Sequence, residues 1–233
     1  MTGRKIKIAI DGPAASGKST TARQVASRLN YIYIDSGAMY RAVAAMAVQK
    51  GVAVENLQEV AKIARGMHFD FRPHPSKTIL FVDGQELTEI IRTPEIDRKV
   101  SPVAANHLVR EILVEKQQEL GKNGGIVMDG RDIGTVVFPD AELKVFMVAS
   151  VAERARRRQL ELAKKGIEVP LQKIEEDIEY RDLQDRSRSH GPLKKAPDAL
   201  ELDTTGLSIE EQVNIICNWA EAVIAGKSPV LPE

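Results

Sequence analysis

Gly12-Pro13-Ala14-Ala15-Ser16-Gly17-Lys18-Ser19-Thr20 decides the fold, because this stretch satisfies the pattern G-x-x-x-x-G-K-[ST] and follows the apolar run Ile6 to Ile10. A strand that leads through such a loop into a helix forms a phosphate-binding loop, since backbone N–H groups and the helix dipole attract polyphosphate. We expect Lys18 to reach the β- and γ-phosphates of a nucleotide and the Ser19 hydroxyl to supply one ligand to Mg²⁺. An ordinary glycine turn is the alternative, but the strand and the helix on either side favour phosphate binding.

The composition excludes several classes of partner. Among 233 residues, 33 basic side chains balance 33 acidic ones, and this zero net charge disfavours a nucleic-acid partner. Cys217 is the only cysteine, so an intrachain disulfide is impossible and a reducing compartment is favoured. The longest apolar run, Ala42 to Val48, is far shorter than the roughly 18 residues that span a membrane. We therefore expect a cytoplasmic monomer that binds neither nucleic acid nor membrane.

A second strand–turn–helix unit follows the first. The apolar run Tyr31 to Ile34 predicts a strand that ends at Asp35-Ser36-Gly37, where Ser36 stands at the expected N-cap of a helix over Ala38 to Gln49. Two parallel strands then present helix N-termini at one edge of a sheet, which is where ligands bind in open α/β sheets. Arg41 lies one turn into the second helix, and its side chain is expected to lean back toward that edge.

The pattern changes after Glu55. Alternating residues with Asp83-Gly84 between two extended runs indicate an antiparallel hairpin. Such a hairpin does not belong between the second and third strands of a parallel sheet. We therefore expect one domain over residues 1–233 that contains an inserted subdomain at residues 63–94, with helices that continue to about residue 122.

The second half of the chain predicts the rest of an α/β fold. Three further strands are expected at Ile126 to Met128, Leu143 to Val148 and Leu200 to Leu202. Between the last two, the charged runs Ala152 to Lys165 and Leu171 to Asp185 predict two helices separated by a Gly/Pro break. These helices form a candidate lid over residues 152–188.

Two groups of polar residues fall at the ligand-binding edge. Asp35 and Ser36 with Arg41 could simply cap a helix, but beside a phosphate loop they make a second anion site. Arg131 and Asp132 directly follow the third strand; their alternative role is a tight turn with a local ion pair. In the functional interpretation Arg131 grips a phosphate and Asp132 offers a carboxylate to a base or to a metal-bound water. Two facing phosphate sites suggest phosphoryl transfer between two phosphorylated molecules.

The lid helices carry clustered arginines, which could equally be a solvated face. The first helix holds Arg154, Arg156, Arg157 and Arg158, and the second holds Arg181, Asp185 and Arg188 at i, i+4 and i+7. A hinged cover that brings arginines to the γ-phosphate and expels water is what an ATP-dependent kinase needs. The four histidines show no spacing typical of a metal site.

Four motifs in this order resemble the bacterial cytidylate kinase family. They are Asp11-Gly12-Pro13 with Ser16-Gly17-Lys18, Asp35-Ser36-Gly37-Ala38-Met39-Tyr40-Arg41, Asp129-Gly130-Arg131-Asp132-Ile133-Gly134-Thr135-Val136-Val137-Phe138-Pro139, and Arg181-Asp182 with Asp185-Arg186-Ser187-Arg188. The resemblance implies MgATP-dependent phosphorylation of CMP and dCMP. It also implies a three-layer P-loop kinase fold with a five-stranded parallel core sheet, an inserted small antiparallel β subdomain and a helical lid.

The resemblance also implies roles for single residues, with Lys18, Arg131, Arg188 and Asp132 as the catalytic set. Ser36, Arg41, Arg131 and Arg188 would hold the acceptor phosphate, and Arg181 with Asp185 the sugar hydroxyls. Ser101, Arg110 and Asp132 would read the cytosine. Arg157 or Arg158 would lie along ATP, which the loop residues Gly12 to Thr20 bind.

Two rival functions are open at this point. Another small-molecule P-loop kinase, such as an adenylate or shikimate kinase, shares the phosphate loop, although the inserted hairpin argues against both. A GTPase-like switch would need a guanine-reading N-K-x-D, which the sequence lacks. The one D-x-x-G, Asp203 to Gly206, follows the last predicted strand rather than an early one.

Overall fold

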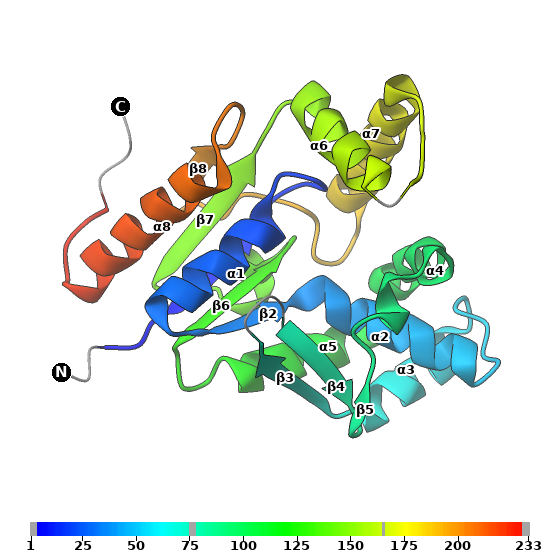
Figure 1. Cartoon of the computed structure of the whole chain (residues 1–233). Coiled ribbons are helices and arrows are strands. Elements are labelled where there is room, and N and C mark those ends of the chain that lie inside the picture. Colours follow the sequence, from blue (N-terminus) through cyan, green and yellow to red (C-terminus); the bar gives the residue numbers. More distant parts are fainter. Residues whose placement is uncertain (1–3, 75–77, 165, 230–233) are drawn as a thin grey trace.

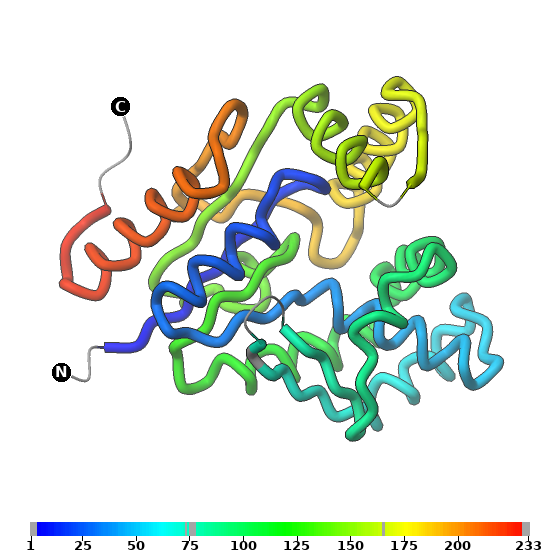
Figure 2. Tube along the Cα trace, in the orientation of Figure 1, coloured from blue at the N-terminus to red at the C-terminus, as the bar shows by residue number. Residues whose placement is uncertain are grey.

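β1 (Lys7–Asp11) is the central strand of a five-stranded sheet in the computed structural model, which describes residues 4–74, 78–164 and 166–229 (Figures 1 and 2). The strand order is β2-β6-β1-β7-β8 and every pairing is parallel. The other strands are β2 (Ile32–Asp35), β6 (Ile126–Gly130), β7 (Leu143–Val148) and β8 (Leu200–Asp203). The five predicted parallel strands are confirmed.

Helices cover both faces of this sheet and give the expected three layers. Side chains of a strand alternate between faces, so Ile8 and Ile10 of β1 pack toward α1 (Lys18–Leu29) and α8 (Ile209–Ile224). Ala9 between them joins the opposite core cluster, to which α2 and α5 contribute. These helices are α2 (Ser36–Gln49) and α5 (His107–Leu120). Burial on both faces explains why the central strands are almost wholly apolar.

A separate three-stranded antiparallel sheet follows α3 (Leu57–Gly66), as the hairpin pattern predicts. Its strands are β3 (Phe69–Pro73), β4 (Thr78–Val82) and β5 (Gln85–Glu86). Asp83 and Gly84 both have left-handed backbones, φ 51° and 83°, which is the conformation that a tight Asp-Gly hairpin turn requires. Leu80 and Val82 of this sheet share a core cluster with α2, so the insert packs onto the main domain.

A short 3₁₀ segment (Ile90–Arg92) and α4 (Pro94–Ala105) lead from the insert back to α5. α4 begins with Thr93 at the N-cap and a proline at the first helical position, where the missing N–H of proline costs no hydrogen bond. A single π-helical turn (Ile133–Val137) follows β6. In the described part of the chain, no helix is long and apolar enough to cross a membrane.

The expected N-cap of α2 is wrong by one residue. Asp35 caps the helix, since its Oδ1 accepts a hydrogen bond from the Ala38 N–H at 2.9 Å. Ser36 is already the first helical residue, and its hydroxyl donates to the Asp129 carbonyl at 2.7 Å. Asp and Ser cap helices about equally well, so the local pattern could not separate them.

The two helices of the candidate lid are α6 (Val151–Ala163) and α7 (Leu171–Ser187), which pack together beyond the carboxyl end of β7 (Figure 1). α7 ends at Ser187, so the expectation that Arg188 shares a helix face with Arg181 is wrong. Arg181 is exposed on α7, whereas Asp185 is buried.

Core packing yields a stability prediction. Leu113 on α5 is 0% exposed, so Leu113→Ala should lower the free energy of unfolding by about 2–5 kcal/mol through lost burial and a residual cavity. Leu160 on α6 is 52% exposed, and Leu160→Ala should change it by less than about 1 kcal/mol. Urea titrations of the two variants check this, and equal losses would contradict the assigned core.

Candidate active site

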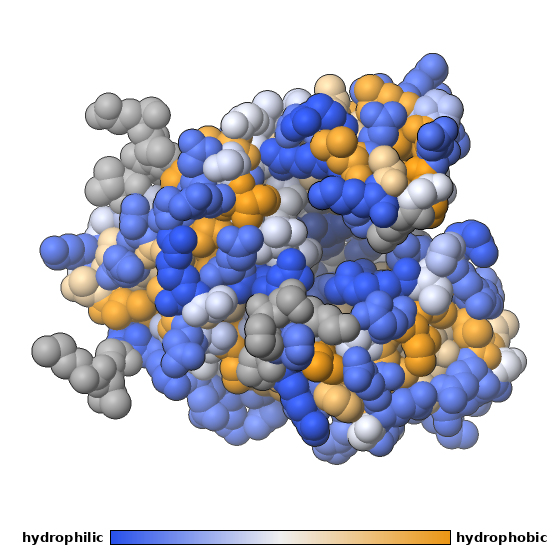
Figure 3. All heavy atoms as spheres, in the orientation of Figure 1, coloured by the Kyte–Doolittle hydropathy of each residue, from blue (hydrophilic) through white to orange (hydrophobic). Residues whose placement is uncertain are grey.

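The candidate site lies along the carboxyl ends of three adjacent strands. The parallel register pairs Asp11 with Gly130 and Asp35 with Asp129, so the ends of β1, β6 and β2 meet at one edge. Figure 3 shows the surface hollowed between the lid helices and the part of the molecule below them, with hydrophilic residues around the hollow. The edge predicted from the sequence is therefore the polar, recessed part of the fold.

The phosphate loop between β1 and α1 has the backbone that its pattern predicts. A Cβ on Gly12 would lie 2.3 Å from the Met147 carbonyl oxygen, so only glycine fits there. Ala15 and Gly17 have left-handed backbones, φ 59° and 92°. Lys18 is buried, and its ammonium donates to the Pro13 carbonyl at 3.1 Å across the loop.

Lys18 lies in an environment that disfavours its charge. Burial, followed by the nearby Arg131 guanidinium, lowers the pKa of Lys18 from its usual 10.5 to about 7. A bound polyphosphate would reverse this effect, because an opposite charge favours the ammonium form. We therefore expect the positive charge on Lys18 to increase when an anion binds to the loop.

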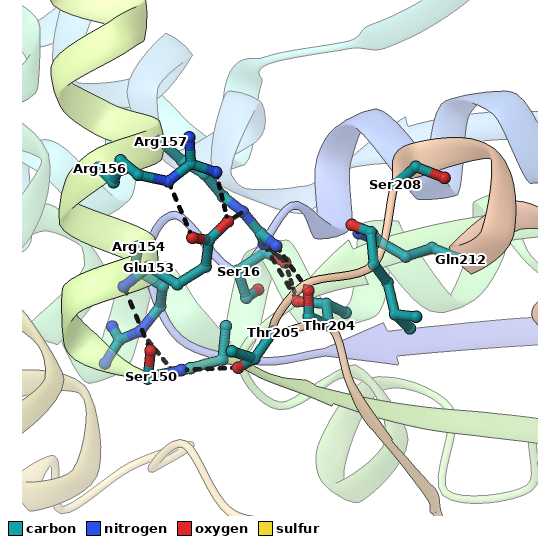
Figure 4. A network of polar contacts seen from close by, with 12 residues as sticks. Ser16, Ser150, Glu153, Arg154, Arg156, Arg157, Thr204, Thr205, Ser208 and Gln212 are labelled. Atoms are coloured by element: carbon teal, nitrogen blue, oxygen red, sulfur yellow. Dashed lines mark hydrogen bonds and ion pairs between the residues drawn. The ribbon is translucent and has the colours of Figure 1, made fainter. Parts of the chain in front are cut away.

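Arg157 from α6 reaches the outside of the same loop (Figure 4). Its guanidinium donates to the Ser16 carbonyl at 3.2 Å, to the Thr204 carbonyl at 2.6 Å and to Glu153 at 2.8 Å. Arg158 instead pairs with Glu161 on the same helix. Of the two lid arginines predicted to lie along ATP, Arg157 is the one that contacts the loop.

Ser19 and Asp129 form a donor set that suits Mg²⁺. The Ser19 hydroxyl donates to Asp129 Oδ2 at 2.7 Å, and the Tyr33 hydroxyl donates to Asp129 Oδ1 at 2.7 Å. Burial, followed by repulsion from Asp35, raises the pKa of the Asp129 carboxyl, so a cation would be favourable there. Hydroxyl and carboxylate oxygens are the protein ligands that Mg²⁺ prefers.

Asp129 is a functional candidate that the sequence reasoning did not assign. The sequence pattern predicts only Ser19 as a ligand to the metal, although Asp129 begins the motif that runs to Pro139. The signal was available, since an acidic residue that ends the strand beside the phosphate-loop strand is the usual second magnesium ligand of such proteins. Among the described residues, no group of three or more His, Cys, Asp or Glu side chains could hold a metal by itself.

A second cationic site faces the phosphate loop from α2. Arg41 Nη2 forms an ion pair with Asp35 Oδ2 at 2.6 Å, while Arg41 Nε is buried without a hydrogen-bond partner in the described chain. Burial alone would raise the pKa of Asp35, but Arg41 and then Arg92 hold it below its usual value. An unpartnered buried N–H on an arginine is suited to an anionic ligand.

Asp185 of α7 connects two of the predicted catalytic arginines. Arg131 Nε donates to Asp185 Oδ2 at 2.5 Å, and Arg188 Nη2 donates to Asp185 Oδ1. Burial would raise the pKa of Asp185, but the two arginines keep it below its usual value. Asp185 thereby brings together Arg131, which follows β6, and Arg188, which follows α7.

Two of the three predicted base-reading residues also meet. Arg110 of α5 and Asp132 form a buried ion pair, with the Tyr40 ring centroid 5.7 Å from the guanidinium carbon. Ser101 is exposed on α4, and it makes no hydrogen bond with this pair within the residues that the structure describes. Within the residues that the structure describes, Arg181 likewise forms no hydrogen bond or ion pair with Asp185.

The lowered pKa of Lys18 predicts proton uptake when a polyphosphate binds. At pH 8 a fraction of Lys18 is neutral, and binding should recharge it because the anion raises its pKa. Calorimetry of pyrophosphate binding in two buffers of different ionisation enthalpy measures the protons taken up. Lys18→Met should take up fewer protons than the wild type at the same pH, and an equal uptake would contradict the assignment.

Comparison with known proteins identifies the family. The family model described as Cytidylate kinase matches residues 8–222. Cytidylate kinases of Bacillus cereus and Bacillus thuringiensis are each 51% identical over 222 residues, covering 95% of this chain and 99% of theirs. A crystal structure of an uncharacterized protein from Eubacterium ventriosum covers 94% of this chain and 99% of its own, with 12% identity and a TM-score of 0.52, and shares the fold. The chain therefore belongs to the cytidylate kinase family.

Proposed function

We propose that this chain transfers the γ-phosphoryl group of ATP to CMP or dCMP, giving ADP and CDP or dCDP. The observation that carries the proposal is the pair of facing anion sites at one sheet edge. The phosphate loop with Lys18 forms the donor site, and Arg41, Arg131 and Arg188 gather on the acceptor side. Two phosphorylated molecules can thus be held with their phosphates in line.

On the donor side, the backbone N–H groups of residues 12–20 would bind the ATP phosphates. Lys18 would stabilise the charge that develops on the transferring phosphoryl group. Ser19 and Asp129 would hold Mg²⁺, which when bound neutralises charge on the β- and γ-phosphates. Arg157, beside Ser16 and Thr204, would line the ATP site, with Arg158 one residue further along α6.

On the acceptor side, Ser36, Arg41, Arg131 and Arg188 would bind the phosphate of CMP. Each of the three arginines is now paired with a carboxylate, and arginine can exchange such a partner for a phosphate because both anions fit its planar fork. Asp185 would accept from a sugar hydroxyl, with Arg181 approaching it when the lid closes.

Arg110 and Asp132 would choose the base. Arg110 can only donate, which suits N3 and O2 of cytosine but not the N3–H of uracil. An ionised Asp132 can only accept, which suits the 4-amino group of cytosine. Ser101 can donate or accept and would discriminate least.

Two segments would move around these sites. Residues 63–94 would act as the subdomain that binds the monophosphate, and residues 152–188 as a lid. Lid closure would exclude water from the γ-phosphate and so suppress hydrolysis. The protein is proposed to act as a cytoplasmic monomer without nucleic-acid or membrane partners.

One assay tests the proposed function directly. ADP release is followed in a coupled assay with CMP, dCMP, UMP, AMP and shikimate as alternative acceptors. CMP and dCMP should give the highest kcat/KM, and Lys18→Met should abolish turnover while CMP still binds. A preference for AMP or shikimate would assign the chain to a different P-loop kinase reaction.

Arg131 and Arg188 provide a sharper test. Arg131→Lys and Arg188→Lys keep the charge but lose the planar fork, so kcat/KM for CMP should fall by at least about tenfold. Arg186→Lys, at an exposed position of α7, is the matched control and should leave kcat/KM unchanged. If both test variants stay within about threefold of wild type, neither arginine grips the acceptor phosphate.

Asp132→Asn tests the choice of base. The amide can donate to the 4-carbonyl of uracil, so the ratio of kcat/KM for CMP over UMP should fall, mainly through better use of UMP. Ser101→Ala should weaken both substrates modestly. If Asp132 instead holds a water on Mg²⁺, the Asn variant will slow both substrates equally and shift the Mg²⁺ dependence. Measuring both substrates across a Mg²⁺ titration separates these roles.

A further inference from the structure

We propose that Arg154 is a positioning residue that holds the phosphate loop in its ATP-binding shape and ties that shape to the lid. This inference rests on the proposed role of ATP as phosphoryl donor. Arg154 lies near the start of α6 and is 4% exposed, unlike the other arginines of the lid cluster. A buried guanidinium needs specific partners, because an uncompensated charge in the interior is costly.

Arg154 has three such partners, and each belongs to a different part of the fold. Its Nε donates to the Ala149 carbonyl after β7 at 3.0 Å, and its Nη1 donates to the Ala14 carbonyl of the phosphate loop at 3.2 Å. Its Nη2 lies 2.8 Å from Asp182 Oδ2 on α7. One rigid guanidinium therefore joins the end of a core strand, the loop and both lid helices.

The contact with Ala14 determines which way the loop N–H groups point. In a planar trans peptide the C=O of one residue and the N–H of the next point in opposite directions. Holding the Ala14 carbonyl toward α6 therefore turns the Ala15 N–H away from α6. Arg157 donates to the Ser16 carbonyl at 3.2 Å (Figure 4), and in the same way this contact turns the Gly17 N–H away from α6. Two arginines of one helix thus orient alternate peptides of the loop.

The N–H groups oriented in this way are unused by the protein. Within residues 4–74, 78–164 and 166–229, neither the Ala15 N–H nor the Gly17 N–H donates to a protein acceptor. Ala15 also has a left-handed backbone, φ 59°, a conformation that is unfavourable for a non-glycine residue. Contacts from outside the loop are needed to keep this conformation populated before a phosphate binds, and Arg154 supplies one beside Ala15.

A lysine at this position could not replace the arginine. The guanidinium reaches three acceptors in different directions at once, whereas an ammonium is a compact charge at the end of a flexible stem. Lysine would keep the ion pair with Asp182, and thus the contact between the lid helices, but could not also hold the Ala14 carbonyl in the same geometry. The Arg154→Lys variant therefore separates loop positioning from simple stabilisation of the lid.

The experiment compares Arg154→Lys and Arg154→Met with Arg156→Met. Arg156 is exposed on the same helix and pairs with Glu153, so it is the matched control. Steady-state kinetics give KM for ATP and for CMP separately, calorimetry gives Kd for ADP, and thermal melts give Tm. For both Arg154 variants we expect KM for ATP and Kd for ADP to rise at least about tenfold, with KM for CMP within about twofold. The Arg156 variant should match wild type.

Other outcomes overturn the proposal. If the Arg154→Lys variant lowers Tm but leaves Kd for ADP within about twofold of wild type, Arg154 only stabilises the lid helices and does not position the phosphate loop. A parallel rise in KM for both substrates would contradict a specific effect on the loop. If Arg154→Met does not fold, the Lys variant decides. ADP binding needs no acceptor, so it tests Arg154 even if wild type fails to phosphorylate CMP and the proposed function itself is wrong.

Discussion

The register of β6 against its two neighbours is the constraint on which the candidate site depends. Parallel pairing places Asp129 beside both Ile10 of β1 and Asp35 of β2, so three chain segments far apart in sequence end at one edge. The phosphate loop, the cap of α2 and the Arg131–Asp132 turn then follow from where each strand stops. A slip of one residue in β6 would turn Asp129 to the other face and separate it from Ser19.

The register also explains how a carboxyl group, that of Asp11, can be buried at the start of the phosphate loop. Asp11 is buried, and burial raises the pKa of its carboxyl to about 7. Its two oxygens accept the N–H groups of Ile133 and Gly134, each at 2.8 Å. The last residue of β1 therefore caps the turn that carries Arg131 and Asp132. The buried Asp11 side chain thus joins the start of the phosphate loop to the turn that carries Arg131 and Asp132.

The fold could be predicted from the sequence because its signals are local. The apolar run before Gly12 predicts β1, and the Asp83-Gly84 pair predicts the hairpin, since each depends on neighbours within a few residues. The same local reasoning fails where two residue types suit one position equally. The choice of Ser36 over Asp35 as N-cap was wrong for this reason. The i, i+7 spacing of Arg181 and Arg188 was misleading for another reason, because α7 ends at Ser187.

The candidate site could be predicted only in part, because its pairings are not local. Arg131 with Asp185 and Arg110 with Asp132 were expected to serve a common site, and the structure brings both pairs together. The sequence positions of the clustered arginines do not indicate which of them is buried. In the structure, Arg154 turns inward to Asp182 and Ala14, whereas Arg156 is exposed to solvent. That difference depends on where α7 packs against α6, which is a tertiary property. Ser101 and Arg181 are exposed, and within the described chain neither forms a hydrogen bond with the paired residues of the site.

Carboxylates already pair with the acceptor-side arginines, and this would shape how a substrate binds. Arg41 pairs with Asp35, while Arg131 and Arg188 share Asp185. Each acceptor-side arginine has a carboxylate partner because a buried cation without one is unstable. Under the proposed function, an incoming phosphate would therefore compete with Asp35 and Asp185 for arginines that already have partners. A phosphate dianion with three oxygens can contact several arginines at once, whereas each carboxylate offers two oxygens. Under the proposed function, selectivity for a phosphorylated acceptor would arise from geometry and charge number together, and Asp185, once released, would be free to accept a hydrogen bond from the sugar.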